Sequence, residues 1–145
     1  GPQLQADGAA SLTGARILLV EDNSVNMLIA VEMLRRWGVS VDQASDGQQA
    51  VAAVQRCAAT GQSYDAVLMD VHMPVMSGHE ATRELRRVHG AEALPIIALT
   101  AAALVSEREQ ALASGMNDFL TKPIDEQRLL QSLQRWVVRR PDPRT

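Results

Sequence analysis

The 145-residue sequence contains a single cysteine, Cys57, and very few aromatic residues. One cysteine cannot form a disulfide within the chain, which is typical of proteins that fold in a reducing compartment. Aromatic residues make up only 3% of the chain, too few for the stacking platforms that bind single-stranded nucleic acid. Cys57 is expected to be a small core residue rather than a redox switch.

Long apolar runs and an excess of positive charge are also missing. No apolar run approaches the roughly 18 residues of a membrane span, and no signal peptide is visible. The formal net charge is -3, and the pair Arg139-Arg140 is too short to form a nucleic-acid surface. We therefore expect a cytoplasmic domain that binds neither nucleic acid nor a membrane directly.

The two ends of the chain differ in composition from its centre. Residues 1–15 have no apolar periodicity, and Gly1-Pro2 resembles the scar that a protease leaves after removing a tag. We expect residues 1–15 to be a disordered linker, residues 16–140 to be one domain cut from a larger protein, and residues 141–145 to be a tail. Pro141 is expected to end the last helix.

Short apolar segments alternate with helical patterns five times along the centre of the chain. The expected strands are residues 16–20, 39–44, 64–69, 95–99 and 118–121, of which 39–44 alternates in polarity like an edge strand. Between them, helical spacing predicts inward-facing side chains that include Leu28, Val88, Leu104 and Leu112. This alternation with short connections predicts an α/β fold in which helices cover both faces of a parallel sheet.

Polar residues follow four of the five strands. Glu21 and Asp22 come after the first strand, Asp70 after the third, Thr100 after the fourth and Lys122 after the fifth. The carboxyl ends of parallel strands meet at one edge of a sheet, so these side chains are expected to converge. Asp70 is expected to be half solvated there.

Three neighbouring carboxylates need a cation. Each pair within about 4–6 Å costs up to roughly 4 kcal/mol at an effective dielectric constant near 20, and one lysine cannot neutralise three acids. An all-oxygen shell suits Mg²⁺ better than zinc. Asp70 would then stay ionised and nucleophilic, while Lys122 and Thr100 receive an arriving anion such as a phosphoryl group. Taken alone, each residue has an ordinary explanation, for example Thr100 as a helix N-cap, so the joint placement carries the hypothesis.

These residues resemble the receiver domain of two-component response regulators. The matching motifs are Leu19–Asn23 with its acidic pair, Met69–Pro74 with Gly78, Leu99-Thr100-Ala101, and Thr121-Lys122-Pro123. The four motifs occur in order and at the spacing of the family, and the similarity covers about Arg16 to Val138. The resemblance implies a flavodoxin-like (βα)5 three-layer sandwich with strand order 2-1-3-4-5.

The resemblance also implies a role for each matching residue. Asp70 is the implied phosphoacceptor, and Lys122 and Thr100 are its implied catalytic partners. The remaining implied roles are Mg²⁺ binding by Glu21, Asp22, Asp70 and the backbone carbonyl of His72; phosphate binding by Thr100, Ala101 and Lys122; switching by Thr100 and Phe119; structural roles for Gly78 and for a cis Pro123; and partner docking by Asn23, Asn26, Met27, Ile29, Pro123 and Ile124.

A receiver of this kind is expected to take a phosphoryl group from phosphohistidine on a histidine kinase or a histidine phosphotransfer domain. The modification would switch its conformation, which makes it a phosphorylation-controlled module rather than an enzyme with turnover. The segment Glu21–Asn26 is most similar to receivers of hybrid sensor histidine kinases, which would tether the domain to a membrane sensor, although a stand-alone receiver would look much the same. A homodimer is a further expectation.

Two other functions use a related arrangement. Phosphatases of the haloacid dehalogenase type also carry an aspartate at a strand end, but they have a second aspartate two residues later, where this chain has His72. Flavodoxins bind the flavin phosphate after the first strand, where Glu21 and Asp22 would repel it. Both features favour the receiver.

Overall fold

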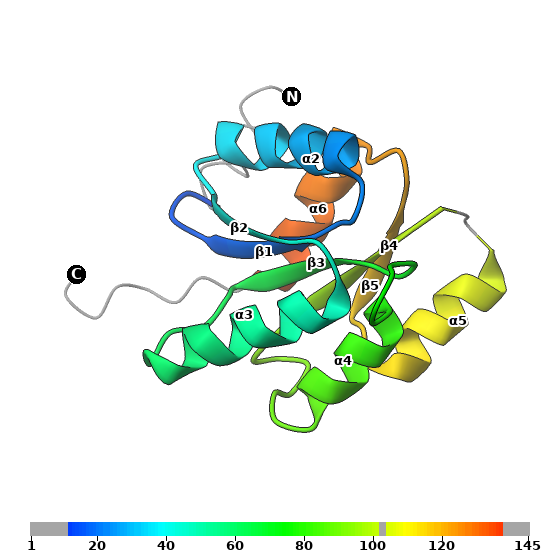
Figure 1. Cartoon of the computed structure of the whole chain (residues 1–145). Helices are drawn as coiled ribbons and strands as arrows, with labels where there is room; N and C mark the ends of the chain where they lie inside the picture. The colour runs from blue at the N-terminus through cyan, green and yellow to red at the C-terminus, as the bar shows by residue number, and fades with distance from the viewer. Residues whose placement is uncertain (1–11, 102–103, 138–145) are drawn as a thin grey trace.

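The computed structural model describes residues 12–101 and 104–137, which form a five-stranded sheet between two layers of helices (Figure 1). In chain order the elements are β1 (Arg16–Val20), α2 (Ser24–Arg36), β2 (Ser40–Ala44), α3 (Gly47–Ala59), β3 (Ala66–Asp70), α4 (Gly78–Arg86), β4 (Ile96–Thr100), α5 (Val105–Ser114), β5 (Asp118–Thr121) and α6 (Glu126–Trp136). All neighbouring strands are parallel, in the order β2-β1-β3-β4-β5. The expected flavodoxin-like architecture is confirmed.

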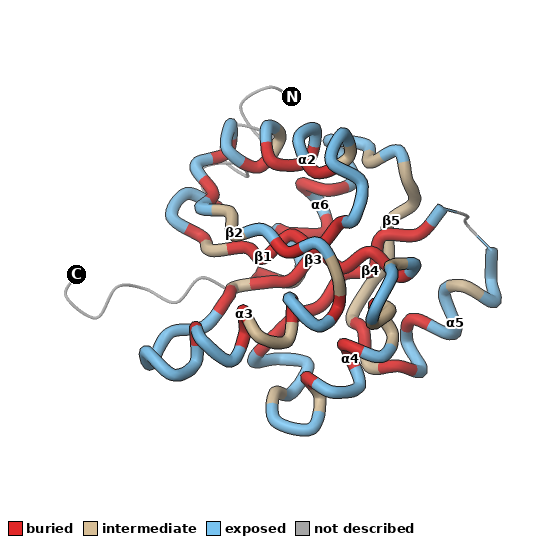
Figure 2. The backbone as a smooth tube through the Cα atoms, in the orientation of Figure 1, coloured by how far each residue is buried: buried red, intermediate tan, exposed pale blue. Residues whose placement is uncertain are grey.

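Burial explains why the strands are so apolar. Every residue of β3 and β4 is buried, because helices cover both faces of the sheet at its centre (Figure 2). The strand β2 lies at one edge of the sheet, as predicted, and keeps Ser40 and Gln43 exposed. The other edge, β5, is half-buried along its whole length.

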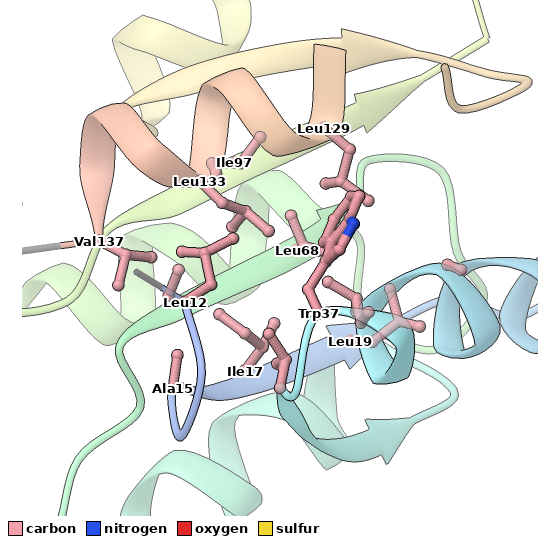
Figure 3. Packing of buried hydrophobic residues seen from close by; sticks show 14 of the residues in the cluster. Leu12, Ala15, Ile17, Leu19, Trp37, Leu68, Ile97, Leu129, Leu133 and Val137 are labelled. Atoms are coloured by element: carbon pink, nitrogen blue, oxygen red, sulfur yellow. The ribbon is translucent and has the colours of Figure 1, made fainter. Parts of the chain in front are cut away.

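Two hydrophobic clusters lie on opposite faces of the sheet. One joins α2 and α6 to the sheet through residues such as Trp37, Leu68 and Leu129 (Figure 3). The other joins α3, α4 and α5 to the opposite face through small side chains that include Ala50, Ala81 and Ala111. Small residues let these helices lie close to the sheet.

Local capping signals explain where most helices begin. The side chain of Asn23 accepts hydrogen bonds from the backbone N–H groups of Val25 and Asn26, and Asp46 and Asp125 cap α3 and α6 in the same way. The residue before α5 is Leu104, whose side chain makes no capping hydrogen bond. Thr100 is instead the last residue of β4, so the N-cap interpretation of Thr100 is wrong.

Four apolar side chains predicted to face inward are exposed: Leu28 at 61%, Val88 at 81%, Leu104 at 57% and Leu112 at 49%. Val88 and Leu104 lie outside the ends of α4 and α5, so helical periodicity does not place them. Along α2 and α5 the buried face is set by neighbours three or four residues apart, such as Ala111 and Ser114. Leu28 and Leu112 lie to one side of those faces.

The N-terminal boundary of the folded part also differs from the prediction. Leu12 and Ala15 are buried in the cluster under α2 and α6 (Figure 3). Gly14 donates its N–H to the carbonyl of Gly38 at 2.9 Å. The predicted linker is therefore wrong for residues 12–15, because Leu12 fills core volume. Residues 1–11 and the predicted helix end at Pro141 lie outside the described residues, and α6 ends at Trp136. Among the described residues, no helix is long and apolar enough to cross a bilayer.

Candidate functional site at the carboxyl end of the sheet

The acidic residues predicted to converge do so. One carboxylate oxygen from each of Glu21, Asp22 and Asp70 lies within 4.8 Å of the others. Glu21 is 3% exposed and Asp70 only 1% exposed, whereas Asp22 faces solvent. The prediction that Asp70 is half solvated is wrong, because the start of α4 and the side chains of Glu21 and Lys122 cover it.

Lys122 places one ammonium group between two of these acids. Its Nζ lies 3.1 Å from Asp70 Oδ2 and 3.4 Å from Glu21 Oε2, and its side chain is 21% exposed. The backbone N–H of Lys122 donates to the carbonyl of Thr100 at 2.7 Å, and the bond between Lys122 and Pro123 is cis. Strand pairing thus brings the ends of β4 and β5 to the carboxylate of Asp70.

Backbone and amide donors hold the buried carboxylates in place. The N–H of His72 donates to Asp70 Oδ1 at 3.2 Å. Glu21 Oε1 accepts from the N–H of Asn23 at 3.2 Å and, more weakly, from the side chain of Asn26 at 3.5 Å. These bonds orient the acids toward one another rather than toward solvent.

The charge balance of the site favours an additional cation. Burial raises the pKa of Asp70 to about 6, the hydrogen bond from Lys122 opposes this rise, and the charge of Glu21 adds to it. Burial by itself would lower the pKa of Lys122, but the hydrogen bond and charge of Asp70, with those of Glu21, hold it above its usual value. One ammonium therefore does not relieve the repulsion among three acids.

The three carboxylates fit a small divalent cation that prefers oxygen. They are the only group of three or more His, Cys, Asp or Glu residues between positions 12–101 and 104–137 with ligand atoms this close together. The cluster contains neither sulfur nor imidazole nitrogen, which suits Mg²⁺ rather than a transition metal. Asp22 offers the solvent-facing oxygen, so water can complete the coordination.

Gly78 is required by the close approach of α4 to the end of β3. A Cβ at this position would lie 2.2 Å from the backbone oxygen of Asp70 and 2.9 Å from the Cα of Val71. No side chain fits there, since the obstructing atoms belong to the backbone. The predicted structural role of Gly78 thus has a direct steric cause.

The residues predicted to bind the phosphate or to switch conformation lie where β4 and β5 border the acidic cluster. Thr100 is fully buried at the end of β4, and Ala101 next to it is exposed. Phe119 is half-buried on β5, where the guanidinium of Arg108 lies 5.9 Å from the centre of its ring. The ring therefore lies between the second hydrophobic cluster and the surface.

The surface predicted for docking needs one correction. Ile29 is 49% exposed, Pro123 is exposed and Ile124 is half-buried, but Met27 is only 9% exposed because it packs into the core beneath α2. Val25 and Leu28, at 63% and 61% exposed, occupy the outer side of α2 instead. Their exposure follows from the rotation of α2 about its own axis, which turns Met27 toward the core and Val25 and Leu28 toward solvent.

Sequence reasoning missed two features of the loop between β3 and α4. Val75 has a φ of 69°, a left-handed conformation that is unusual for a β-branched residue. A Cβ on Gly47 would lie 2.5 Å from the carbonyl oxygen of Met76, so the start of α3 touches this loop directly. Only the Val-Met-Ser-Gly composition after Pro74 hints at an irregular turn.

Comparison with known proteins agrees with this geometry. A family model for the response regulator receiver domain matches residues 17–134. The chain belongs to this family. The sensor protein GacS of Pseudomonas syringae is 41% identical over 134 residues, which cover 88% of this chain and 14% of that protein. The chain therefore spans a small part of the length of such a relative.

Solved receiver structures share the fold. The receiver domain of the sensor histidine kinase PA1611 from Pseudomonas aeruginosa, solved with a magnesium ion in its active site cleft, is 48% identical, with a TM-score of 0.76 over 86% of this chain and 98% of that chain. The receiver of the Saccharomyces cerevisiae regulator Ssk1, solved with the histidine phosphotransfer protein Ypd1, is 30% identical, with a TM-score of 0.76 over 87% and 90%.

Proposed function

We propose that this domain accepts a phosphoryl group on Asp70 from a phosphohistidine, in a reaction that needs Mg²⁺, and that the modification switches its conformation within a phosphorelay. The observation that carries the proposal is a buried Asp70 held between Lys122 and an acidic pair. A buried carboxylate with a raised pKa does little to stabilise the fold. Such a group is typical of a functional site, and here it fits a nucleophile that lies beside a bound cation.

Each site residue has a different role in the proposed transfer of the phosphoryl group. An oxygen of Asp70 bonds to phosphorus while the bond from phosphorus to the donor imidazole nitrogen breaks, and the electron pair leaves with the imidazole. Lys122 and the hydroxyl of Thr100, with the backbone of Ala101, bind the phosphoryl oxygens. Glu21, Asp22, Asp70 and the backbone carbonyl of His72 would hold Mg²⁺, which when bound would supply positive charge to the phosphoryl oxygens.

Phosphorylation would change the balance of charges that now holds the site together. The new group carries nearly two negative charges, so Lys122 has a stronger partner than the carboxylates at 3.1 and 3.4 Å. Thr100 and Phe119 lie on neighbouring strands, β4 and β5. We propose that Thr100 moves toward the phosphoryl group and that Phe119 and the start of α5 reorganise with it.

The proposed donor is a histidine kinase or a histidine phosphotransfer domain. Its docking surface consists of Asn23, Asn26, Ile29, Pro123 and Ile124, together with the exposed Val25 and Leu28. An Ile29→Asp variant should react normally with a small-molecule donor but slowly with a phosphorylated histidine phosphotransfer domain. Equal slowing with both donors would contradict this surface.

The wider context is part of the same proposal. Residues 16–140, extended by 12–15, would form the receiver unit, between a linker and a tail. The proposal includes a cytoplasmic location, attachment to a hybrid sensor kinase, no direct nucleic-acid binding and the option of a homodimer. Similarity to GacS and to hybrid histidine kinases supports the attachment. We place the chain outside the turnover enzymes because His72 stands where a phosphatase would carry its second aspartate.

The decisive experiment is incubation with acetyl phosphate and Mg²⁺, followed by intact mass measurement. We expect one adduct of a single phosphoryl group, stable in acid and labile in base. The adduct should be absent from Asp70→Asn and should not form when Mg²⁺ is removed by a chelator. The same adduct on Asp70→Asn would refute the assignment, and sustained phosphate release from an unactivated monoester would favour the phosphatase.

A further inference from the structure

The strand β5 begins with two side chains that point to opposite faces of the sheet. Phe119 packs against the cluster under α3, α4 and α5, whereas the carboxylate of Asp118 reaches α6 on the other face (Figure 1). Successive side chains of a strand alternate in this way. The first two residues of β5 therefore contact both helical layers.

The carboxylate of Asp118 accepts three hydrogen bonds. Its Oδ2 accepts from the hydroxyl of Ser132 at 2.9 Å and from the indole Nε1 of Trp136 at 3.0 Å. Its Oδ1 accepts from the backbone N–H of Phe119 at 2.8 Å. Hydrogen bonds to an ionised acceptor are roughly twice as strong as those between neutral groups. One charged group thus holds two successive turns of α6 together with the residue proposed to reorganise on phosphorylation.

The bonds from Ser132 and Trp136 are the only hydrogen bonds between β5 and α6 in the part of the chain that the structure describes. Elsewhere α6 contacts the sheet through apolar side chains such as Leu129 and Leu133. Apolar contacts have no preferred direction, whereas hydrogen bonds weaken steeply when they are misaligned. Asp118 therefore sets the position of the last turn of α6 relative to β5.

Phe119 and Trp136 also line one cavity, of about 130 Å³, between α5, β5 and α6. The guanidinium of Arg108 lies 5.9 Å from the centre of the Phe119 ring, and that of Arg135 lies 5.0 Å from the centre of the Trp136 ring. Protein interiors are close-packed and contain few voids of this size. The cavity leaves Phe119 room to move without displacing the core.

We propose that Asp118 is a positioning residue that couples Phe119 to α6, so that phosphorylation of Asp70 displaces the last turn of α6 around Trp136. The inference rests on the proposed function, because it needs a phosphoryl group to move Phe119. The Asp118 carboxylate moves with Phe119, since the two residues are adjacent on the backbone and hydrogen-bonded to each other. Trp136 follows because it shares one oxygen of that carboxylate with Ser132.

The coupling extends to the segment that precedes β1. Leu12 belongs to the same buried cluster as Leu133 and Val137, which lie on α6 and directly after its end (Figure 3). A displacement of the last turn of α6 therefore changes the packing of Leu12. The output of the switch is then α6 together with residues 12–15, on the face of the sheet opposite to the Phe119 ring.

Nuclear magnetic resonance of the indole N–H of Trp136 tests the coupling directly. The chain has two tryptophans, and the signal missing from Trp136→Phe is that of Trp136. We expect this signal to shift when acetyl phosphate and Mg²⁺ phosphorylate Asp70, in proportion to the adduct measured by intact mass, and not to shift with Mg²⁺ alone. In Asp118→Ala the adduct should still form, but the shift that depends on phosphorylation should be lost.

Asp125→Ala is the matched control, because Asp125 also accepts hydrogen bonds from α6, at its start, from the N–H groups of Gln127 and Arg128. This variant should keep the full shift of the Trp136 signal. Ser132→Ala removes one of the two α6 donors and should reduce the shift. Circular dichroism checks that each variant is folded, and Ser132→Ala decides the question if Asp118→Ala is not.

The possible outcomes separate this inference from the proposed function. An adduct on Asp70 without a shift of the Trp136 signal would overturn the inference and leave the proposed function standing. A shift of equal size in Asp118→Ala and in the unsubstituted chain, or its loss in folded Asp125→Ala, would also overturn the coupling through Asp118. If no adduct forms on the unsubstituted chain, the proposed function fails and this inference fails with it.

Discussion

At the scale of single residues, the site depends on one ammonium group shared by two buried carboxylates. Lys122 contacts Asp70 and Glu21, and the pKa of Asp70 is still raised to about 6. The charges are thus incompletely balanced in the protein alone. Removing Lys122 should make this imbalance considerably worse, since an unpaired buried charge is costly.

We expect Lys122→Met to lower the free energy of unfolding by about 2–4 kcal/mol at pH 7.5 in the presence of a chelator. Mg²⁺ should recover a larger part of the stability in this variant than in the original chain. Urea denaturation with and without Mg²⁺ measures both effects. Arg36→Met is the control, because it breaks an exposed ion pair with Glu126 and should cost under about 1 kcal/mol. Equal losses in the two variants would contradict the argument.

The only tyrosine of the chain offers a test that involves no metal. Burial raises the pKa of Tyr64 well above its usual value, and the hydrogen bond of its hydroxyl to Asp42, 2.6 Å long, adds to the rise. A phenol whose pKa is raised on folding contributes stability below the unfolded pKa near 10, and this contribution is lost as the pH rises above it.

We therefore expect the tyrosinate absorbance near 295 nm to appear only as the protein unfolds in alkali. In Asp42→Asn the absorbance should appear at lower pH, since the negative charge near the phenol is gone. Asp65→Asn, which changes an acid that accepts from the backbone N–H of Arg16 instead of from the tyrosine, is the comparison. Ionisation of Tyr64 near pH 10 in the folded protein would refute the prediction.

At the scale of elements, the loop between β3 and α4 is built around close backbone contacts. The start of α4 lies against the carbonyl of Asp70 at Gly78, and the start of α3 touches the same loop at Gly47. Neither position leaves room for a Cβ atom. The geometry of the Asp70 carboxylate therefore depends on two glycines that have no reactive side chain.

Gly78→Ala should lower the free energy of unfolding by about 1–3 kcal/mol, because the new methyl group meets backbone atoms that cannot move aside. Gly90→Ala is the matched control, since a Cβ there meets nothing within 4 Å. Denaturant unfolding of both variants makes the comparison. If Gly78→Ala is as stable as Gly90→Ala, the close approach of α4 is not a constraint.

At the scale of the whole molecule, the site is assembled from the ends of four strands, β1, β3, β4 and β5, at one edge of the sheet. A ligand held there binds only the folded chain, so its binding free energy adds to global stability. The stability of the whole domain therefore depends on whether the carboxylate oxygens of the acidic cluster bind a cation. Asp22 is suited to test the link because it is exposed, whereas Glu21 and Asp70 are buried.

We expect Mg²⁺ at one hundred times its dissociation constant to stabilise the domain by about 2.7 kcal/mol. Thermal melts with increasing Mg²⁺ measure this directly. The shift should be much smaller in Asp22→Ala and unchanged in Glu92→Ala, which removes an exposed acid outside the cluster. An equal shift in all three proteins would mean that the ion binds elsewhere.

The amino-acid sequence was sufficient to predict the order and type of every described strand and helix. Continuous apolar runs such as Ile96–Leu99 mark buried parallel strands, and residues such as Asn23 and Asp125 mark helix starts, because these signals are local. The convergence of Glu21, Asp22 and Asp70 was also predictable, since parallel topology brings all the carboxyl ends to one edge.

Other features depended on contacts between segments far apart in the chain. The burial of Asp70 and Met27, the exposure of Val25 and Leu28, and the inclusion of Leu12 in the core are set by which helix lies against which strand. No local pattern encodes that choice.

The sequence by itself thus determined the fold class and the set of acids, hydroxyl and ammonium at the end of the sheet. Tertiary structure alone decided that Lys122 lies 3.1 Å from Asp70 and that α4 requires Gly78. The physical reason is the distance along the chain over which each interaction acts. Periodicity and capping act over a few residues, whereas burial and charge pairing act between residues that only packing brings together.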